Sequence, residues 1–423
     1  MKFYIKILFL TFLVYNAFSA DKITLEQCYQ LAEKNYPAAR QIEEQKSVSD
    51  LKIKNFNAKY YPGLNLFGQA TYQSDVTKVN LPPQFPITIP YLTKDQYRFG
   101  VSVDQLIWDG GAIGDSKALE RVQSDAAQTG IEVELYNLRQ KINDSYFNVI
   151  LLRKKQEQLE ITKADLVSKL TTIRIKVYNG VLLGNNADIL DVEIQKIEQT
   201  GEEVQAGIKT SIYALEQLLN SNIGDSTYFE LPSPDFGDTA ETEHLRKEYR
   251  LFSLNKSGLD AMQELNSSSY YPKIAAFAQY MYGKPGFNMF NPDFQTFYIV
   301  GLKASWNIWD WNTTSRENEI LKIQKDIVNS QEDVFSLNLS IALKNYLNEI
   351  DKLENLIEQD KQIIILRHKI VEQASSQLDN GVITATEYVA DVNAESQARL
   401  ALEVHNVELV RAKVNYLTQA GKN

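Results

Sequence analysis

The sequence predicts an internally duplicated chain that combines four membrane-length β-strands with long coiled-coil helices. Residues 60–72 read YYPGLNLFGQATY and residues 270–282 read YYPKIAAFAQYMY. A second matched pair follows in each half, GVSVDQLIWD at 100–109 and GLKASWNIWD at 301–310. Each pair is followed by a helical pattern of unusual length. Internal repeats of this kind define the architecture and have to be found before single elements are assigned.

The repeated segments have the pattern of strands with one apolar and one polar face. Residues 64–72, 97–107 and 298–306 alternate between apolar and polar or small side chains, which is the period of a β-strand. Each segment is about 9 to 11 residues long, the length of a tilted strand that crosses a membrane. The loops 73–96 and 283–295 are polar or rich in proline, which suits the outer face of a membrane barrel.

Aromatic side chains gather at the opposite ends of these strands. Rings of this kind form belts at membrane interfaces because one end is apolar and the other is wet. Alternation alone also permits the aromatic core of a soluble sandwich. The predicted interface residues are Tyr60, Tyr61, Trp108, Tyr270, Tyr271, Trp306 and Trp309, with Trp311 beside them.

Three-four spacing of apolar residues predicts a helix from about 112 to 178 and an equivalent helix in the second half. The first would be on the order of 100 Å long. Asn179-Gly180-Val181 and Asn380-Gly381-Val382 predict sharp turns. Return helices are expected at about 188–220 and 386–419.

Helix ends are predicted from single residues. Thr24 and Gln27 form a capping-box pattern at the start of a helix expected to run from 24 to about 57. Asp109 and Asp310 are expected to cap the helices that follow the strands. The glycines after Asp109 permit a tight bend.

The chain opens with the pattern of a secretory signal peptide, residues 1–19, cleaved after Ser19 or Ala20. The remaining organisation is predicted as a first structural repeat at 20–222, a linker at 223–242 and a second repeat at 243–423. No later window holds 18 consecutive apolar residues, so no membrane-spanning helix is expected. The single cysteine, Cys28, is expected to be buried. A formal net charge of −10 argues against nucleic-acid binding.

Four membrane-length strands cannot close a barrel alone, and lipid does not tolerate an open sheet edge. The chain is therefore expected to oligomerise. The long helices present more apolar surface than one hairpin can bury, so they should pack in a ring as well. These two requirements predict a membrane-anchored tube, a membrane β-barrel that continues into an α-helical barrel.

Several motifs together resemble the TolC-type outer-membrane efflux proteins: the opening ITLEQCYQLA at 23–32 followed by NYP at 35–37, the Tyr-Pro strand entries, GVSV at 100–103 followed by WDGG at 108–111, and the glycine tip turns. The resemblance covers nearly the whole chain after the signal peptide. It implies a homotrimer with a 12-stranded barrel in the cell outer membrane and a helical tunnel through the periplasm. It also implies an exit duct for efflux or type I secretion that works with a periplasmic adaptor and an inner-membrane pump. Drugs, metals and proteins remain open as cargo.

In that family the helical tips close the duct and dock the adaptor. The matching residues are Asn179, Gly180, Val181, Leu182, Asn380, Gly381, Val382 and Ile383. Ordinary helix capping would explain the same Asn-Gly pairs. The first tip has more residues before its expected return helix than the second, so the two turns need not bind alike.

Acidic residues just inside the return helices are candidates for a gate. Glu387 stands where family members often place an acidic ring, and Asp391, Asp188 and Asp191 are further candidates. Three copies of a carboxylate around a narrow axis would attract cations and raise one another's pKa. The alternative is that these are solvated carboxylates near helix N-termini. The family's tyrosine and arginine latch positions hold Leu378 and Ile383 here, which predicts a gate that is looser or differently bonded.

Catalysis, cofactors and metal sites are not expected. His244, His368 and His405 are isolated in the sequence, and no nucleophile elbow or phosphate loop is present. The rival class is a soluble periplasmic structural or adaptor coiled coil, which would need no detergent.

Overall fold

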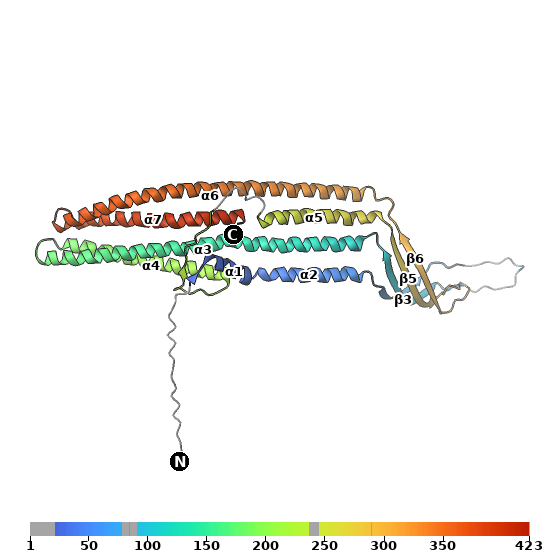
Figure 1. Cartoon of the computed structure of the whole chain (residues 1–423). Helices are drawn as coiled ribbons and strands as arrows, with labels where there is room; N and C mark the ends of the chain where they lie inside the picture. The colour runs from blue at the N-terminus through green and yellow to red at the C-terminus, as the bar shows by residue number, and fades with distance from the viewer. Residues whose placement is uncertain (1–21, 78–83, 85–90, 237–244, 289, 423) are drawn as a thin grey trace, which may run out of the picture. The chain divides into compact units, whose positions relative to one another are not determined.

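The computed structural model describes residues 22–77, 84, 91–236, 245–288 and 290–422. The predicted signal peptide and the prolines Pro82, Pro83, Pro86 and Pro90 lie outside these residues. The first half contains β1 Lys22–Ile23, α1 Leu25–Asn35, α2 Ala39–Ala58, β2 Gly63–Tyr72, β3 Asp95–Trp108, α3 Ala112–Tyr178, α4 Asn185–Leu219 and β4 Tyr228–Phe229 (Figure 1). The second half contains α5 Lys247–Ser267, a 3-10 turn Ser268–Tyr270, β5 Lys273–Lys284, β6 Gln295–Ser305, α6 Thr313–Asp379 and α7 Ala385–Ala420.

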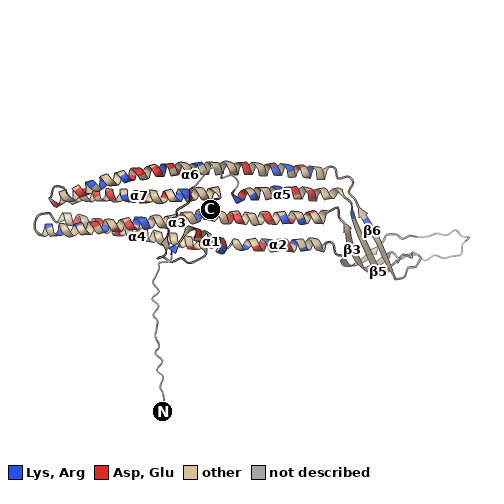
Figure 2. Cartoon of the chain, viewed as in Figure 1, with Lys and Arg blue, Asp and Glu red and all other residues tan. Residues whose placement is uncertain are grey.

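This order confirms the prediction of helix, two strands, long helix, tip turn and return helix in each half. The capping box of Thr24 and Gln27 is formed, with the Gln27 amide donating to the Thr24 hydroxyl at 3.2 Å. Figure 2 shows charged residues all along the helices, whereas the strands carry few. Within the described residues, no helix combines the length and apolarity that crossing a membrane requires.

The single helix expected from 24 to 57 is wrong, because the chain forms two helices there. α1 ends at Asn35 and α2 begins at Ala39. Pro37 lies between them, and Tyr36 has the extended conformation (φ −61°, ψ 136°) that a residue before proline prefers. Proline also lacks the N–H that a continuing helix would need. The apolar periodicity resumes after the break, so periodicity alone predicts one continuous helix.

Residues 40–131 and 247–336 form one compact unit, which contains a four-stranded sheet in the order β2-β3-β5-β6. All neighbours are antiparallel. Pairing places the alternating apolar residues of the four strands on one face, and most of them are exposed there, including Leu64, Leu66, Phe99, Tyr280, Tyr298, Val300 and Leu302. The predicted alternation is therefore confirmed as one wide apolar face.

Aspartates start the two helices that follow the strands, as predicted. Asp109 Oδ2 accepts a hydrogen bond from the Ile113 amide at 2.7 Å, and Asp310 Oδ2 accepts one from the Thr314 amide at 2.9 Å. The bend before α3 uses Gly110 at φ 74°. The bend before α6 uses Trp311 at φ 57°, which is a strained conformation for a residue with a side chain.

Residues 1–39, 132–246 and 337–423 form the second compact unit, which holds the helical hairpins. Its core includes apolar residues of the predicted three-four spacing in α3 and α6, with Ile142, Val149, Leu166, Ile173 and Leu378 fully buried. Cys28 is also buried, as expected, and burial raises the pKa of its thiol to about 12. Strand β4, inside the predicted linker, pairs in parallel with β1. The sequence did not predict this pairing.

Candidate functional site

The two hairpin tips have the same backbone geometry. α3 ends with Gly180 at φ 72°, and the Val181 amide donates back to the Lys176 carbonyl at 2.8 Å. α6 ends with Gly381 at φ 70°, and the Val382 amide donates to the Gln377 carbonyl at 2.9 Å. A left-handed glycine followed by such a bond is the Schellman cap. The predicted turns are therefore confirmed as helix caps.

Apolar side chains nevertheless project from these caps. Tyr178, Val181 and Leu183 at the first tip are 91, 64 and 75% exposed, and Val382 at the second tip is 70% exposed. Leu182 and Ile383 instead pack against the buried core of the hairpins. A cap needs only the Asn-Gly pair, so the exposed apolar residues call for another explanation.

The two tips also contact each other. The Ala385 amide donates to Asn186 Oδ1 at 3.0 Å, and Leu182 lies beside Gly381. α4 begins at Asn185, earlier than the position 188 expected from the sequence. The connection 179–184 is therefore only one residue longer than the connection 380–384.

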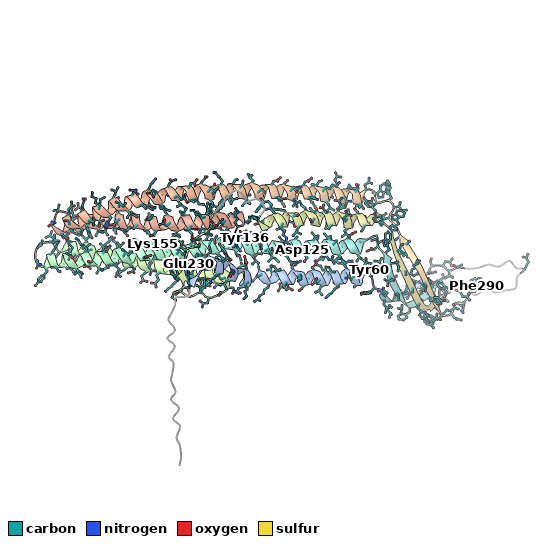
Figure 3. All side chains as sticks on the ribbon, in the orientation of Figure 1. Tyr60, Asp125, Tyr136, Lys155, Glu230 and Phe290 are labelled. Carbon is teal, nitrogen blue, oxygen red and sulfur yellow. The ribbon has the colours of Figure 1, made fainter. Side chains whose placement is uncertain are left out.

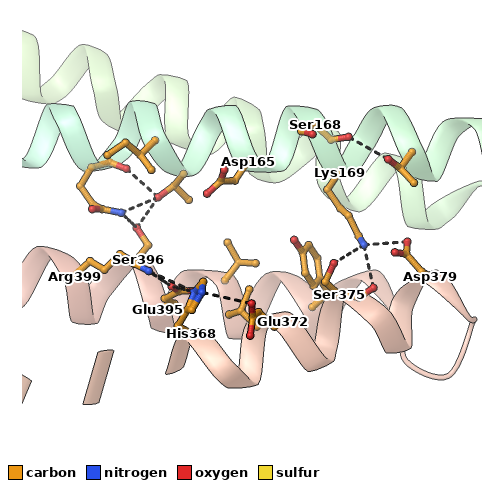
Figure 4. A pocket seen from close by; sticks show the side chains of 17 residues that line it. Asp165, Ser168, Lys169, His368, Glu372, Ser375, Asp379, Glu395, Ser396 and Arg399 are labelled. Atoms are coloured by element: carbon orange, nitrogen blue, oxygen red, sulfur yellow. Dashed lines mark hydrogen bonds and ion pairs between the residues drawn. The ribbon is translucent and has the colours of Figure 1, made fainter. Parts of the chain in front are cut away.

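Two lysines of α3 hold the end of α6. Lys169 Nζ lies 2.9 Å from Asp379 Oδ1 and donates to Ser375 Oγ at 2.7 Å. Lys176 Nζ lies 2.8 Å from Asp379 Oδ1 and donates to the Asp379 carbonyl at 3.0 Å. Figure 4 shows Lys169 reaching Ser375 and Asp379 from the opposite helix. We call these four residues the lysine clamp.

The clamp sets the ionisation of its carboxylate. Burial raises the pKa of Asp379, but hydrogen bonds from Lys176 and Lys169 outweigh it, so the net shift is downward. The cations also lie at the C-terminus of α6, where the helix dipole favours positive charge. Asp379 therefore stays ionised and holds α3 and α6 together near the tips.

The four candidate gate acids have different surroundings. Glu387 forms a capping box with Thr384, whose amide donates to Glu387 Oε2 at 2.8 Å. This bond and one from the Thr384 hydroxyl lower the pKa of Glu387. Asp191 pairs with Arg174 at 2.7 Å, Asp188 is exposed in the first turn of α4, and Asp391 is half-buried.

Between α3 and the α6–α7 hairpin lies a groove of about 890 Å³, lined largely by polar residues (Figure 4). The lysine clamp forms one part of its wall. At another part, His368 Nδ1 lies 2.9 Å from Glu395 Oε1, and Arg399 Nη2 lies 2.5 Å from the same oxygen. His405 pairs with Asp360 elsewhere along this hairpin. Both histidines are isolated in the sequence but paired in the fold.

No local motif in the sequence marks the lysine clamp or the histidine pairs. The clamp joins α3 to α6, and the histidine pairs join the consecutive helices α6 and α7 across 27 and 45 residues. Only the heptad register could have placed Lys169 on the face that meets α6. Within the described residues, no group of three or more His, Cys, Asp or Glu side chains could hold a metal ion.

The predicted interface aromatics lie where the strands meet the helices, and all are exposed: Tyr60, Tyr61, Trp108, Tyr270, Tyr271, Trp306 and Trp309. Figure 3 shows Tyr60 at this junction. The Trp306 indole donates to the Tyr270 carbonyl at 2.9 Å, and Trp108 packs edge-on against Tyr271 with ring centroids 6.2 Å apart. Trp306 therefore has a polar anchor, and Trp108 and Tyr271 have an aromatic neighbour, while part of each ring stays exposed.

No family model matches the chain, and no curated protein matches it. Solved structures do match. The Campylobacter jejuni CmeC outer membrane channel gives a TM-score of 0.68 at 12% identity, covering 94% of this chain and 85% of that chain. The Vibrio cholerae outer membrane protein VceC gives 0.69 at 12% identity, covering 94% and 96%.

The Neisseria gonorrhoeae MtrE outer membrane channel, in its open state, gives a TM-score of 0.65 at 13% identity, covering 94% of this chain and 89% of that chain. At such identities the likeness establishes the fold and not the activity. It extends over the sheet and the helical hairpins together. The resemblance seen in the sequence is thereby confirmed for the single chain, which has a TolC-like fold like that of these outer-membrane channels.

Proposed function

We propose that this protein is the outer-membrane exit duct of a tripartite efflux or type I secretion system. Three copies would each contribute four strands to one barrel, and their hairpins would form a helical barrel in the periplasm. The duct would conduct passively, and an inner-membrane pump with a periplasmic adaptor would supply the cargo. No catalytic step and no cofactor is part of this proposal.

The observation that carries the proposal is the wide apolar face of the sheet. Leu64, Leu66, Val300 and Leu302 are each at least 70% exposed on it. A contiguous apolar surface of this kind marks contact with a membrane or a partner. The rival reading, a soluble periplasmic coiled coil, offers nothing to cover this face, whereas lipid would cover it completely.

The tips support adaptor docking. Val181, Leu183 and Val382 are exposed although the caps do not need them. Apolar side chains at the end of a helical hairpin suit the tip of another helical hairpin, which would bury them. The first tip exposes more apolar surface than the second, so it would contribute more to the contact.

Closure at the tips is assigned to the lysine clamp together with the acidic candidates. The clamp joins helices from the two halves of one protomer. Opening would require these bonds to break or shift. Glu387 is a candidate for an acidic ring only in the assembled trimer, where its three copies would approach one axis.

The test is single-channel conductance of detergent-purified protein in a planar bilayer, beside its Glu387→Ala variant. Discrete conductance steps would support a duct, and larger steps in the variant would place a constriction at the second tip. Unchanged conductance steps in the variant would show that Glu387 is not a gate residue and would leave the proposed duct intact. If folded protein gave no insertion at all, the proposal would fail in favour of the soluble coiled coil.

A further inference from the structure

The second face of the sheet is largely polar, with Phe277 and Ile299 as single apolar side chains in otherwise polar or glycine rows, and it carries one row that is apolar throughout. Pairing places Phe67 beside Gly100, Gly100 beside Met281, and Met281 beside Phe297. This row carries no polar side chain, and we call it the apolar row. The neighbouring rows on the same face are Asn65, Ser102, Gln279 and Ile299 on one side and Gln69, Arg98, Gly283 and Gln295 on the other.

Gly100 makes the apolar row possible. A Cβ atom at this position would lie 2.9 Å from Met281 Cγ and 2.5 Å from the Tyr280 carbonyl oxygen. The Met281 side chain therefore lies across β3 and is only 5% exposed. Phe67 and Phe297, at the two ends of the row, are half-buried. Three strand spacings separate them, on the order of 14 Å.

A further ring extends the row into solvent. Phe287 follows β5, and its ring centroid lies 4.7 Å from that of Phe297. Phe287 is 61% exposed. The β6 end of the apolar row therefore presents an open pair of aromatic rings on a largely polar face.

A cation stands in the next row. The Arg98 side chain lies across Gly283, where a Cβ atom would meet Arg98 Cγ at 3.2 Å. Arg98 is exposed, and within the described part of the chain it has no carboxylate partner. By contrast, Lys284 on the other face is paired with Asp95 at 2.6 Å. The guanidinium is thus available in the row next to the apolar row.

We propose that the apolar row, Phe287 and Arg98 form a contact site for amphiphilic organic anions that pass through the duct. The proposal rests on the proposed function, because it requires the polar face to line the lumen. Aromatic rings bind the apolar face of such a molecule, and a free guanidinium binds its carboxylate or sulfonate.

The same site offers little to a hydrated metal cation. Its apolar side chains supply no ligands in exchange for water, and the Arg98 guanidinium repels positive charge. The Met281 thioether is of the type that binds soft metal ions, but it is buried, and the apolar row holds no other sulfur ligand. Among the open cargo classes, the site therefore favours small amphiphiles over metals.

The test measures blockage of single-channel current. Naphthalene sulfonate is the probe, methanesulfonate controls for the charge alone, and a naphthyl ammonium ion of the same size controls for the ring alone. We expect naphthalene sulfonate to give longer blockages than either control. In Phe287→Gln/Phe297→Gln the blockage duration should fall about tenfold, and it should also shorten in Arg98→Gln.

Ile299→Gln is the matched variant, because it makes the same apolar-to-amide change in a row that already holds three polar side chains. It should leave the blockages unchanged. Equal blockage by the three probes on the unmodified channel would overturn the proposal, even if the double variant failed to assemble. Conducting channels with unchanged blockage in both site variants would overturn it too. A folded protein without any conductance would instead refute the proposed function, and the site with it.

Discussion

Lys169 of α3 and Asp379 of α6 form an ion pair of 2.9 Å between helices that belong to different halves of the chain. The Lys169 side chain is 8% exposed, and it also caps the Ser375 carbonyl at 3.0 Å. Lys176, which lies further along α3 toward the tip, forms an ion pair with the same carboxylate. The tip of the second hairpin is therefore held by the first hairpin, and the bonds that hold it are electrostatic.

Replacing Lys169 with Met should loosen the tips without unfolding the protein. The variant keeps the apolar stem of the side chain and the ion pair between Lys176 and Asp379. The free energy of unfolding should therefore fall by about 1 kcal/mol. We expect faster hydrogen exchange of amides in 376–385 and a larger single-channel conductance. Lys361→Met, which removes an exposed pair with Glu358, is the control and should change neither. Unchanged hydrogen exchange in Lys169→Met would show that the lysine clamp does not hold the tips together.

Acid should weaken the same region. The folded-state pKa values of Asp379 and Glu387 are lowered, so the unfolded chain binds more protons in acid. Their stabilisation is present above the unfolded pKa, about 4, and is lost as the pH falls through the lower folded values. The Tm difference between the wild type and Asp379→Asn/Glu387→Gln should be constant above about pH 5 and shrink below. A difference that grows in acid would contradict this sign.

Gly110→Ala should destabilise the junction between β3 and α3. Gly110 has φ 74°, and a Cβ there would lie 2.8 Å from Tyr271 Cβ and 2.9 Å from the Ser268 carbonyl oxygen. The expected loss is about 2 kcal/mol or more in the free energy of unfolding. Gly114→Ala is a close control, because its added Cβ meets nothing within 4 Å in a helix. That variant should gain about 0.5–1 kcal/mol, as denaturant titration would reveal.

Asn143→Ala should be costly because Asn143 joins three helices inside the helical unit. It accepts a hydrogen bond from the Tyr29 hydroxyl and donates to Asn415 Oδ1 at 2.9 Å and Thr418 Oγ1 at 3.3 Å. Truncation leaves buried partners unsatisfied, at a cost of about 2–4 kcal/mol in the free energy of unfolding. Asn355→Ala, which removes one exposed bond to the Asp351 carbonyl, should cost well under 1 kcal/mol. Similar losses in both variants would refute the special role of Asn143.

Local chemistry made most of the fold predictable. Alternation identified the strands, the Asn-Gly pairs identified both tip turns, and Asp109 and Asp310 cap the helices as expected. Each of these signals lies within a few residues of the element that it defines. The missed helix break at Pro37 shows the limit of periodicity as a signal. The apolar pattern continues on both sides of the proline, so it predicts one helix where the chain forms two.

The candidate site was less predictable, because its contacts are long-range. Lys169 and Asp379 meet only after α3 has packed on α6, and His368 and Glu395 only after α6 has packed on α7. The pairing of β1 with β4 escaped prediction since each strand has only two residues. Glu387 stays a candidate gate residue, since its role depends on copies of the chain around one axis.

The order β2-β3-β5-β6 leaves each protomer with two unlike sheet edges, β2 and β6. Copies that join through these edges meet head to tail, and such a heterologous contact has no stopping point of its own. The number of copies in a closed ring is then set by the rotation from one copy to the next and not by the strand pairing. In the proposed duct, each protomer would carry two unpaired edges until the ring closed, so ring closure would compete with mispairing of the edges.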